Sequence, residues 1–318
     1  MGSVEAREFG KLRRRAAGLP WDRFLAREAT VSIRASATRS RLYHTGALAE
    51  TTALAIADAV PGARVAIKDK DEDEPAVAVL VRGEADRFTF SVDASGERLH
   101  RRGARIEVGA APMRETLAAG LLALAGWDPT QALFDPVCGA GTIAIEAALQ
   151  AVDRAPGFDR EFALEDWPLF AASGDGAAAV RERARSRVRP AAPAPIAASD
   201  RDPAVIESAA RNAARAGVAE QIAFACRDLG DARPPAGQPG LVIANPPYGR
   251  RLGDPRAAVR VYRDLGRLLR AHFRGWRAAV VVPARLPGAG DALRLTLPDR
   301  HRLRNGGLPI ELRVGSIT

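Results

Sequence analysis

The chain has 318 residues, 47% of them apolar and 27% charged, so it is long enough for two domains with sizeable cores. The N-terminal stretch lacks the apolar segment of a secretory signal, and no apolar run is long enough to span a membrane, which indicates a cytoplasmic location. Two cysteines without a CxxC pair indicate neither a disulfide framework nor a zinc site, so we expect no metal.

The formal net charge is +9, which favours a polyanionic partner such as RNA. Only three of the 47 basic residues are lysine, and the chain is rich in Ala, Gly and Pro. This composition is also typical of a GC-rich genome, so charge by itself is weak evidence for nucleic-acid binding. We expect a monomer.

The first third of the chain has an α+β pattern. A helix with apolar periodicity is predicted over 45–60, between the first two of several short strands. The predicted strands are 29–35, 63–69, 76–83 and 87–95. The acidic stretch 69–75 is predicted to be a solvated hairpin loop.

From residue 112 onward, helices alternate with strands that are apolar on both faces. The predicted helices are 112–126, 141–151, 203–217 and 255–273, and the predicted strands are 132–137, 195–200, 222–228, 240–247 and 277–284. This alternation predicts a parallel, doubly wound α/β sheet, the Rossmann-like class. Residues 152–194 interrupt the rhythm with Pro, Gly and an Arg-rich helix, and we interpret them as an insertion.

The stretch FDPVCGAGTIAIEAAL, residues 134–149, reads as a strand, a glycine turn and a helix. Gly139, Gly141 and Ala144 fit the G-x-G-x-x-A pattern of dinucleotide sites. However, the carboxylate of Asp135 just before the turn would repel a pyrophosphate and attract a ligand that carries an ammonium and a sulfonium group. The sequence therefore favours S-adenosylmethionine as cofactor over a nicotinamide dinucleotide.

Two further acids end the next two strands. Asp200 is placed to accept hydrogen bonds from the ribose hydroxyls, and Asp228 from the adenine amino group, although such acids also commonly cap helices, a role that the position of Asp202 before Pro203 also fits. Cys138 is interpreted as a small packing residue of the turn. The candidate cofactor-binding residues are Asp135, Cys138, Gly139, Gly141, Thr142, Asp200, Asp228 and Asn245.

The sequence NPPY, residues 245–248, follows the apolar strand at 240–247. The double proline stops the strand and fixes the backbone. The Asn245 side-chain oxygen and the Pro246 carbonyl can each accept one hydrogen of an exocyclic amine, which orients its lone pair toward a methyl donor, and Tyr248 can stack on a base. These three residues are the catalytic candidates. The motif fits transfer to adenine N6, cytosine N4, guanine N2 or a glutamine amide.

Several segments together resemble the THUMP-domain RNA methyltransferases that modify guanine N2 in large-subunit rRNA and tRNA. They are DPVCGAGTIAIEAA, APGFDREFALEDWPLF (155–170), ASDRDPAVIESAARNAARAG (198–217), NPPYGRRL, the connector over 91–127 and the C-terminal NGGLPIELR. The resemblance implies a class I methyltransferase domain over 111–318, preceded by a smaller α+β THUMP-like RNA-binding domain over 1–110. It also implies guanine N2 as the target. Family members carry a ferredoxin-like segment before THUMP, whereas only about 25 residues precede it here, so this segment is expected to be either degenerate or shortened.

Basic residues in three places are candidates for RNA contact. They are Arg39 and Arg41 in RSRLYH, the group His100, Arg101 and Arg102, and the pair Arg250 and Arg251 after the NPPY motif. A fourth feature is a stripe of six arginines along the predicted helix 255–273, opposite an apolar face of Ala258, Val261, Leu265 and Leu268. Such a stripe, at positions 256, 260, 263, 267, 270 and 274, is more often a solvated helix face, and the alternative is that it follows a phosphate backbone.

The leading hypothesis is an S-adenosylmethionine-dependent RNA methyltransferase that acts on guanosine N2 in rRNA or tRNA. The alternatives are an N-methyltransferase for adenine N6 or a protein glutamine, and a non-catalytic RNA-binding or ribosome-assembly factor. A dehydrogenase is disfavoured by Asp135 and by the NPPY motif.

Overall fold

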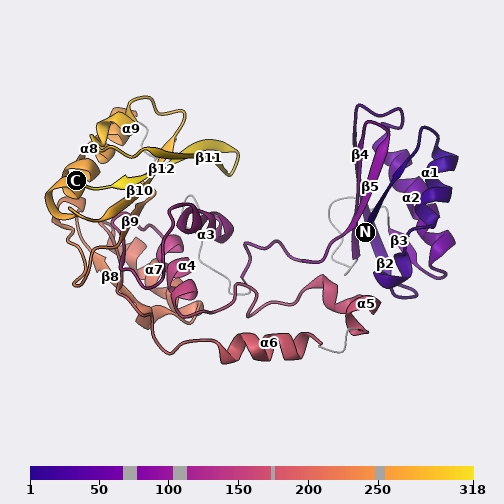
Figure 1. The fold of residues 1–318 in the computed structure, drawn as a ribbon, viewed down its shortest axis with the longest axis horizontal. Helices are drawn as coiled ribbons and strands as arrows, with labels where there is room; N and C mark the ends of the chain where they lie inside the picture. The colour runs from indigo at the N-terminus through magenta and orange to yellow at the C-terminus, as the bar shows by residue number, and fades with distance from the viewer. Residues whose placement is uncertain (67–76, 103–112, 173–175, 248–254) are drawn as a thin grey trace. The chain divides into compact units, whose positions relative to one another are not determined.

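The protein is described by a computed structural model that covers residues 1–66, 77–102, 113–172, 176–247 and 255–318. It divides into two compact units (Figure 1). The first unit comprises Met1–Leu99 together with Arg160–Arg183, and the second comprises His100–Asp159 and Ala184–Thr318. The chain therefore crosses between the units three times. The centre of the predicted insertion groups with the first unit, and the functional assignment of the two units stays a prediction.

The first unit contains a five-stranded sheet covered by two helices. Its elements are β1 (Gly2–Glu5), α1 (Phe9–Ala17), β2 (Thr30–Thr38), α2 (Thr45–Ala59), β3 (Arg64–Ala66), β4 (Val77–Glu84) and β5 (Arg87–Val92), with a 3₁₀ turn at Trp21–Arg23. The strand order is β1-β5-β4-β2-β3. Strand β2 pairs in parallel with β3 and β4, whereas the β4–β5 and β1–β5 pairs are antiparallel. The predicted strands and helix of this region are present, and the predicted residues 67–69 and the acidic loop lie outside the described residues.

Residues before position 26 contribute to the core of this unit. Strand β1 extends the sheet, α1 packs on α2, and Trp21 is fully buried. The Trp21 indole donates a hydrogen bond to the Ala16 carbonyl over 2.7 Å and lies edge-on to Phe90, with ring centroids 5.9 Å apart. A buried indole with its N–H satisfied is a strong packing anchor.

The segment Arg160–Arg183 packs on the first unit through specific contacts. It contains a 3₁₀ turn (Ala163–Asp166), α5 (Pro168–Ala171) and most of α6 (Ala177–Ser186). The Arg160 guanidinium donates to the carbonyls of Ser95 and Glu97 over 2.7 and 2.6 Å, and Trp167 meets Phe24 edge-on with centroids 5.0 Å apart. These contacts explain why the segment groups with residues far from it in the sequence.

The second unit contains a seven-stranded sheet. Its elements are α3 (Glu115–Leu124), β6 (Leu133–Asp135), α4 (Thr142–Ala151), β7 (Ile196–Asp200), α7 (Pro203–Arg215), β8 (Ile222–Cys226), β9 (Leu241–Ala244), α8 (Pro255–His272), β10 (Arg277–Pro283), α9 (Ala289–Ala292), β11 (Asp299–Asn305) and β12 (Leu308–Ser316), with 3₁₀ turns at Ala219–Gln221 and Leu229–Asp231. The strand order is β11-β12-β10-β9-β6-β7-β8. The five strands from β10 to β8 are parallel, and β12 is antiparallel to both of its neighbours.

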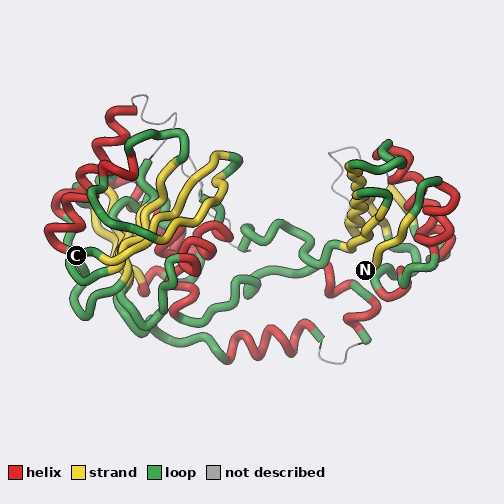
Figure 2. Tube along the Cα trace, turned by 45° about the horizontal axis from the view of Figure 1, so that its top comes forward, coloured by secondary structure: helices red, strands yellow, loops and turns green. Residues whose placement is uncertain are grey.

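Helices cover both faces of this sheet (Figure 2). One hydrophobic core joins the sheet to α3, α4 and α7 and includes Leu121, Ala147 and Ala213, and the other joins it to α8 and α9 and includes Leu265 and Ala289. The doubly wound parallel architecture predicted from the sequence is thus confirmed. The hairpin β11–β12 was not predicted.

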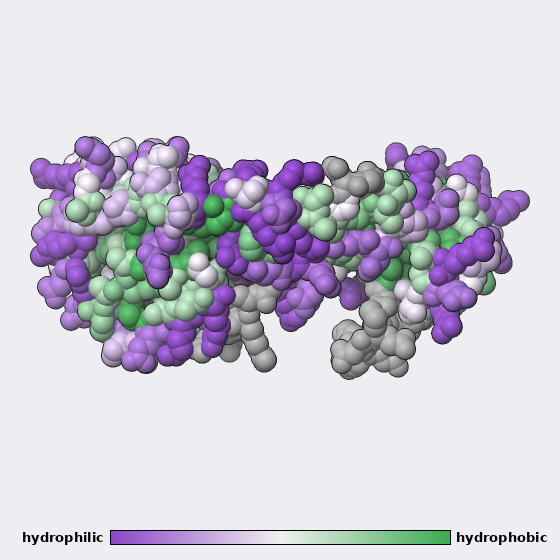
Figure 3. All heavy atoms as spheres, turned by 90° about the horizontal axis from the view of Figure 1, so that it is seen from below, coloured by the Kyte–Doolittle hydropathy of each residue, from purple (hydrophilic) through white to green (hydrophobic). Residues whose placement is uncertain are grey.

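No helix among the described residues is long and apolar enough to cross a membrane. Hydrophilic residues spread over the face drawn in Figure 3, with apolar residues between them.

Candidate active site

The candidate site lies at the carboxyl end of the parallel strands, where the strand order reverses. In chain order the parallel strands run outward from β6 to β7 and β8 on one side, and the next strand, β9, pairs on the other side of β6. Such a switch point is where open α/β sheets bind ligands, because the loops leave in opposite directions. Asp135 ends β6, Asp200 ends β7, and Asn245 directly follows β9. The fold therefore brings three predicted site residues to one edge of the sheet.

The glycine turn after β6 is held by backbone hydrogen bonds. The Cys138 N–H donates to the Ser199 carbonyl over 3.0 Å, and the Gly139 N–H donates to the Asp200 carboxylate over 3.1 Å. Gly141 is the N-cap of α4 and has a φ of +84°, a left-handed conformation that favours glycine. A Cβ at Gly141 would lie 3.1 Å from the Ala209 Cβ. Glycine is thus required here both for its backbone conformation and for close packing on α7.

Gly139 differs from Gly141 in what surrounds it. Its φ is +55°, and a Cβ built there would meet no described atom within 4 Å. The space beside Gly139 is therefore open, next to the N-terminus of α4, where Thr142 begins the helix. A backbone free of side-chain atoms at this point lets a ligand approach closely.

Asp135 is a buried acid with an exposed fraction of 1%. Its side-chain oxygen accepts a hydrogen bond from the Val137 N–H over 3.2 Å. Burial, together with the nearby negative charge of Asp200, raises the pKa of Asp135 to about 7, against the lowering effect of the Val137 hydrogen bond. The carboxylate thus lacks a cationic partner within the described protein, and a ligand ammonium would supply one.

The other two predicted acids lie in different surroundings. The Asp200 carboxylate accepts from Gly139 and, over 3.2 Å, from the Asp202 N–H, so it links the glycine turn to the start of α7. Asp202 caps α7 by accepting from the Ala204 N–H. Asp228 is exposed at the start of the 3₁₀ turn after β8. A carboxylate with two backbone donors still has lone pairs for hydroxyl donors, so Asp200 remains able to accept from a ribose.

Cys138 is a buried thiol. Burial and the negative charges of Asp135 and Asp200 raise the pKa of Cys138 far above its ordinary range. A thiol in such surroundings stays protonated and is a poor nucleophile. Its properties agree with the role of a packing residue in the turn.

The side-chain oxygen of Asn245 is a polar atom whose hydrogen bonding is incomplete among the described residues. This oxygen is buried and has no hydrogen-bond partner among the described residues; the same holds for the Ser199 hydroxyl on β7. A buried oxygen without a donor is unfavourable by about 1–3 kcal/mol, so its retention calls for an explanation. Pro246, which follows, is buried. Tyr248, Arg250 and Arg251 lie outside the described residues.

Two structural residues near the site were missed in the sequence. Asn212 on α7 is fully buried, and its amide donates to the Ala140 carbonyl in the glycine turn over 3.1 Å. Its signal was a polar residue on the apolar face of a helix, beside Ala209 and Ala213. Glu146 on α4 is also buried and pairs with Arg102 over 2.8 Å.

The predicted RNA-binding residues are distributed over both units. In the first unit, Arg39 forms an ion pair with Glu84, and the Arg41 side chain is exposed. In the second unit, Arg102 is engaged by Glu146. His100 is half-buried and Arg101 is exposed. The structure therefore gives Arg102 a partner within the protein.

The arginine stripe on α8 is solvent-facing along most of its length. Ala258, Leu265 and Leu268 are buried opposite it, as predicted, whereas Val261 is half-buried. Arg270 departs from the pattern, because it donates to the carbonyls of residues 293 and 294 over 2.5 and 2.8 Å. Contact of this stripe with RNA stays a prediction.

Comparison with known proteins gives a consistent answer. Residues 102–289 match the family described as RMKL-like, methyltransferase domain. A candidate RNA methyltransferase of Synechocystis sp. is 34% identical over 313 residues, which cover 98% of this chain and 80% of the relative. The chain belongs to the RMKL-like methyltransferase domain family.

Other relatives extend this result. The large-subunit ribosomal RNA methyltransferase K/L of Methylococcus capsulatus is 39% identical over 277 residues, which cover 82% of this chain and 36% of that enzyme. This chain thus spans little more than a third of the K/L enzyme. A candidate methylase from Clostridium difficile 630 is 31% identical, with a TM-score of 0.83 over 100% of this chain and 82% of that one. The candidate methyltransferase SMU.472, solved with S-adenosylhomocysteine (SAH), is 26% identical, with a TM-score of 0.84 over 100% of this chain and 82% of that one.

The fold of this RMKL-like chain is that of S-adenosylmethionine-dependent methyltransferases, which confirms the cofactor expected from the sequence. The residues of the site suit such a ligand. The open space beside Gly139 admits a ligand against the backbone, and the buried Asp135 carboxylate complements an ammonium group. Among the described residues, no group of His, Cys, Asp and Glu side chains could hold a metal ion.

Proposed function

We propose that this chain methylates the exocyclic N2 amine of a guanosine in large-subunit ribosomal RNA. The observation that carries the proposal is the buried Asn245 oxygen without a described partner, placed beside the glycine turn at the switch point of the sheet. Family membership, the ribosomal RNA methyltransferases among its relatives and the net charge of +9 support an RNA substrate.

The chemistry assigned to the protein is orientation of an amine. The cofactor supplies an electrophilic methyl group on a sulfonium. The Asn245 side-chain oxygen and the Pro246 carbonyl accept the two amine hydrogens, which turns the nitrogen lone pair out of the base plane toward the methyl group. The N–C bond forms as the S–C bond breaks, and the amine proton, made acidic by the new bond, leaves to water. Tyr248 is proposed to stack on the base.

The remaining residues hold the methyl donor. Asp135 is proposed to bind the ammonium of its methionine part, Asp200 the ribose hydroxyls and Asp228 the adenine amino group. Gly139, Gly141 and Thr142 shape the turn against which it lies, with Cys138 packed beneath. The first unit is proposed to be a THUMP-like RNA-binding domain.

The test is identification of the methylated nucleoside. Large-subunit rRNA from cells lacking this protein is incubated with the protein and labelled S-adenosylmethionine, then digested and analysed. We expect label in N2-methylguanosine and a fall in kcat of about 100-fold for Asn245→Ala, the scale seen when one transition-state hydrogen bond is removed. Retained SAH binding by the variant separates a catalytic loss from a folding defect.

Other outcomes would redirect the assignment. Label in methyladenosine would overturn guanine as the target while keeping the reaction type. Label in a protein glutamine, with none in RNA, would overturn the RNA substrate. An Asn245→Ala variant as active as the wild type would remove Asn245 from the mechanism.

A further inference from the structure

Tyr43 stands out on the surface of the first unit. Its exposed fraction is 74%, the highest among the large apolar side chains of the described residues. It lies in the loop 39–44 that joins β2 to α2. A single exposed apolar residue needs no explanation by itself, but the structure of this loop gives Tyr43 a defined setting.

Alternate residues of the loop are fixed from the inside. The Ser40 hydroxyl accepts from the Asp86 N–H and donates to the Thr38 carbonyl, both over 3.1 Å. Leu42 is buried in the core of the unit, with an exposed fraction of 6%. The His44 ring nitrogen accepts from the Ala47 N–H and so caps α2. The loop backbone is therefore held at every second residue.

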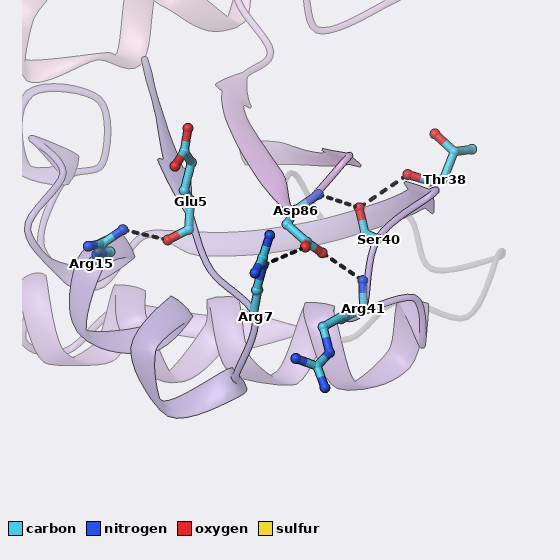
Figure 4. A network of polar contacts seen from close by, with 7 residues as sticks. All are labelled: Glu5, Arg7, Arg15, Thr38, Ser40, Arg41 and Asp86. Carbon is cyan, nitrogen blue, oxygen red and sulfur yellow. Dashed lines mark hydrogen bonds and ion pairs between the residues drawn. The ribbon is translucent and has the colours of Figure 1, made fainter.

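Asp86 in the β4–β5 turn organises the same loop (Figure 4). Its carboxylate accepts from the Arg41 N–H over 2.7 Å and from the Arg7 guanidinium over 3.0 Å. Asp86 has a φ of +65° and its neighbour Ala85 a φ of +47°, and such values in non-glycine residues cost free energy that the surrounding contacts must offset. The turn thus holds the Asp86 carboxylate against the loop.

The residues between the anchors face solvent. The Arg41 guanidinium is directed away from Asp86 in Figure 4 and has no hydrogen bond or ion pair with any of the described residues, whereas Arg7 is paired with Asp86 and Arg39 with Glu84. Arg41 and Tyr43 therefore present an exposed cation and an exposed aromatic ring, two residues apart, on a loop backbone that hydrogen bonds already fix.

We infer that Arg41 and Tyr43 form a contact site for unpaired RNA, in which Tyr43 stacks on a base and Arg41 binds an adjacent phosphate. Single-stranded nucleic acid is bound by exposed aromatic rings that stack on bases and by basic side chains that contact the backbone phosphates, and stacking on tyrosine tolerates any base. The inference rests on the proposed RNA substrate. It adds that Tyr43 is a contact residue and that the RNA bound there is unpaired.

The experiment uses the full chain and a fluorescein-labelled, unstructured 12-nucleotide RNA of mixed sequence, with binding followed by anisotropy over a range of KCl concentrations. We expect Tyr43→Ala to raise Kd about tenfold with an unchanged salt slope, because one base-stacking contact is lost. Tyr43→Phe keeps the ring and should bind within about twofold of the wild type. Arg41→Ala should flatten the slope of log K against log salt by about 0.7, the value for one phosphate of a single strand.

Two control variants come from the same unit. Leu54→Ala removes another exposed apolar side chain, and Arg34→Ala removes another exposed arginine. Both should bind the RNA like the wild type. Tyr43→Ala with the Kd of Leu54→Ala, or no binding of the 12-mer by the wild type, would overturn the inference.

Parallel assays separate this inference from the proposed reaction. RNA binding that depends on Tyr43, without methyl transfer to any RNA, would support the contact site and overturn the reaction. Methylation of RNA, together with RNA binding that does not change in the Tyr43 and Arg41 variants, would support the reaction and overturn the contact site.

Discussion

Replacing Asp135 by Asn is expected to stabilise the protein without cofactor while weakening cofactor binding. The side chain keeps its size and an acceptor for the Val137 N–H, while its charge is removed and one carboxylate oxygen becomes an amide NH2. Because the carboxyl is buried beside Asp200, its ionised form is disfavoured in the folded protein. The variant tests whether the negative charge of Asp135 lowers the stability of the cofactor-free protein and raises its affinity for the cofactor.

The magnitude follows from the pKa. Folding raises the pKa of Asp135 from an ordinary 3.8 to about 7, a difference worth about 4 kcal/mol at 1.36 kcal/mol per pH unit. The folded pKa is the higher one, so stability is fully present below the unfolded pKa and is lost as pH rises through 7. Asp135→Asn should therefore gain up to about 4 kcal/mol over the wild type at pH 8, and its advantage should shrink by that amount toward pH 4.

Urea unfolding of the cofactor-free protein at pH 4, 6 and 8 measures this difference. The cost of burying the Asn amide is the same at each pH, so the change of the difference with pH isolates the carboxylate. Asp228→Asn, which removes the charge of an exposed acid after β8, serves as the matched control. A pH-independent difference between Asp135→Asn and the wild type, or unchanged SAH affinity in Asp135→Asn by calorimetry, would refute the reasoning.

Three further predictions concern residues around the site. Arg102→Ala should destabilise the protein by about 3 kcal/mol in urea, more at high pH, because it leaves the buried Glu146, whose pKa burial already raises, without its counter-ion; an effect on RNA affinity without a stability loss would contradict this. Gly141→Ala should cost about 1–3 kcal/mol and weaken SAH binding in calorimetry, since its φ is +84°; wild-type stability would show that the turn relaxes freely. Iodoacetamide should modify the exposed Cys226 and spare the buried Cys138 in mass spectra of the native protein, and both thiols should react once it is unfolded.

The parallel sheet could be predicted because its signals are local. Strands β6, β7, β9 and β10 are apolar on both faces and are followed by helices. Each strand–helix unit could therefore be predicted from a short stretch of sequence. The glycine turn and the acids at the strand ends followed from the same windows. Because parallel strands end at one edge, correct strand assignments already placed Asp135, Asp200 and Asn245 together.

The C-terminal hairpin β11–β12 has a local sequence signal that predicts it. Gly306 and Gly307 separate two alternating stretches and have φ values of +53° and +89°, the two-residue turn that glycine favours between antiparallel strands. Two glycines between alternating apolar and polar stretches predict a hairpin from the sequence alone.

Other features depend on partners that are distant in the sequence. Arg160 binds carbonyls more than 60 residues away, so nothing near it indicates that its segment leaves the second unit. Likewise, Arg102 looked like one of several exposed basic residues because Glu146, its partner, lies 44 residues further along the chain. Composition and periodicity show which side of a helix or strand is apolar. They do not show which element, distant in the sequence, packs against that side.

Two of the buried polar groups at the site, on Asp135 and Asn245, are unfavourable in the described protein for different reasons. The Asp135 carboxylate lacks a counter-charge, so a cationic ligand that binds it should stabilise the fold more at pH 8 than at pH 5, in addition to the mass-action stabilisation of about 2.7 kcal/mol at a ligand concentration of 100 Kd. The Asn245 oxygen lacks only a donor, so its contribution should not change with pH over that range. Cofactor binding should therefore carry the pH dependence of this site, and the proposed binding of an amine by Asn245 should not.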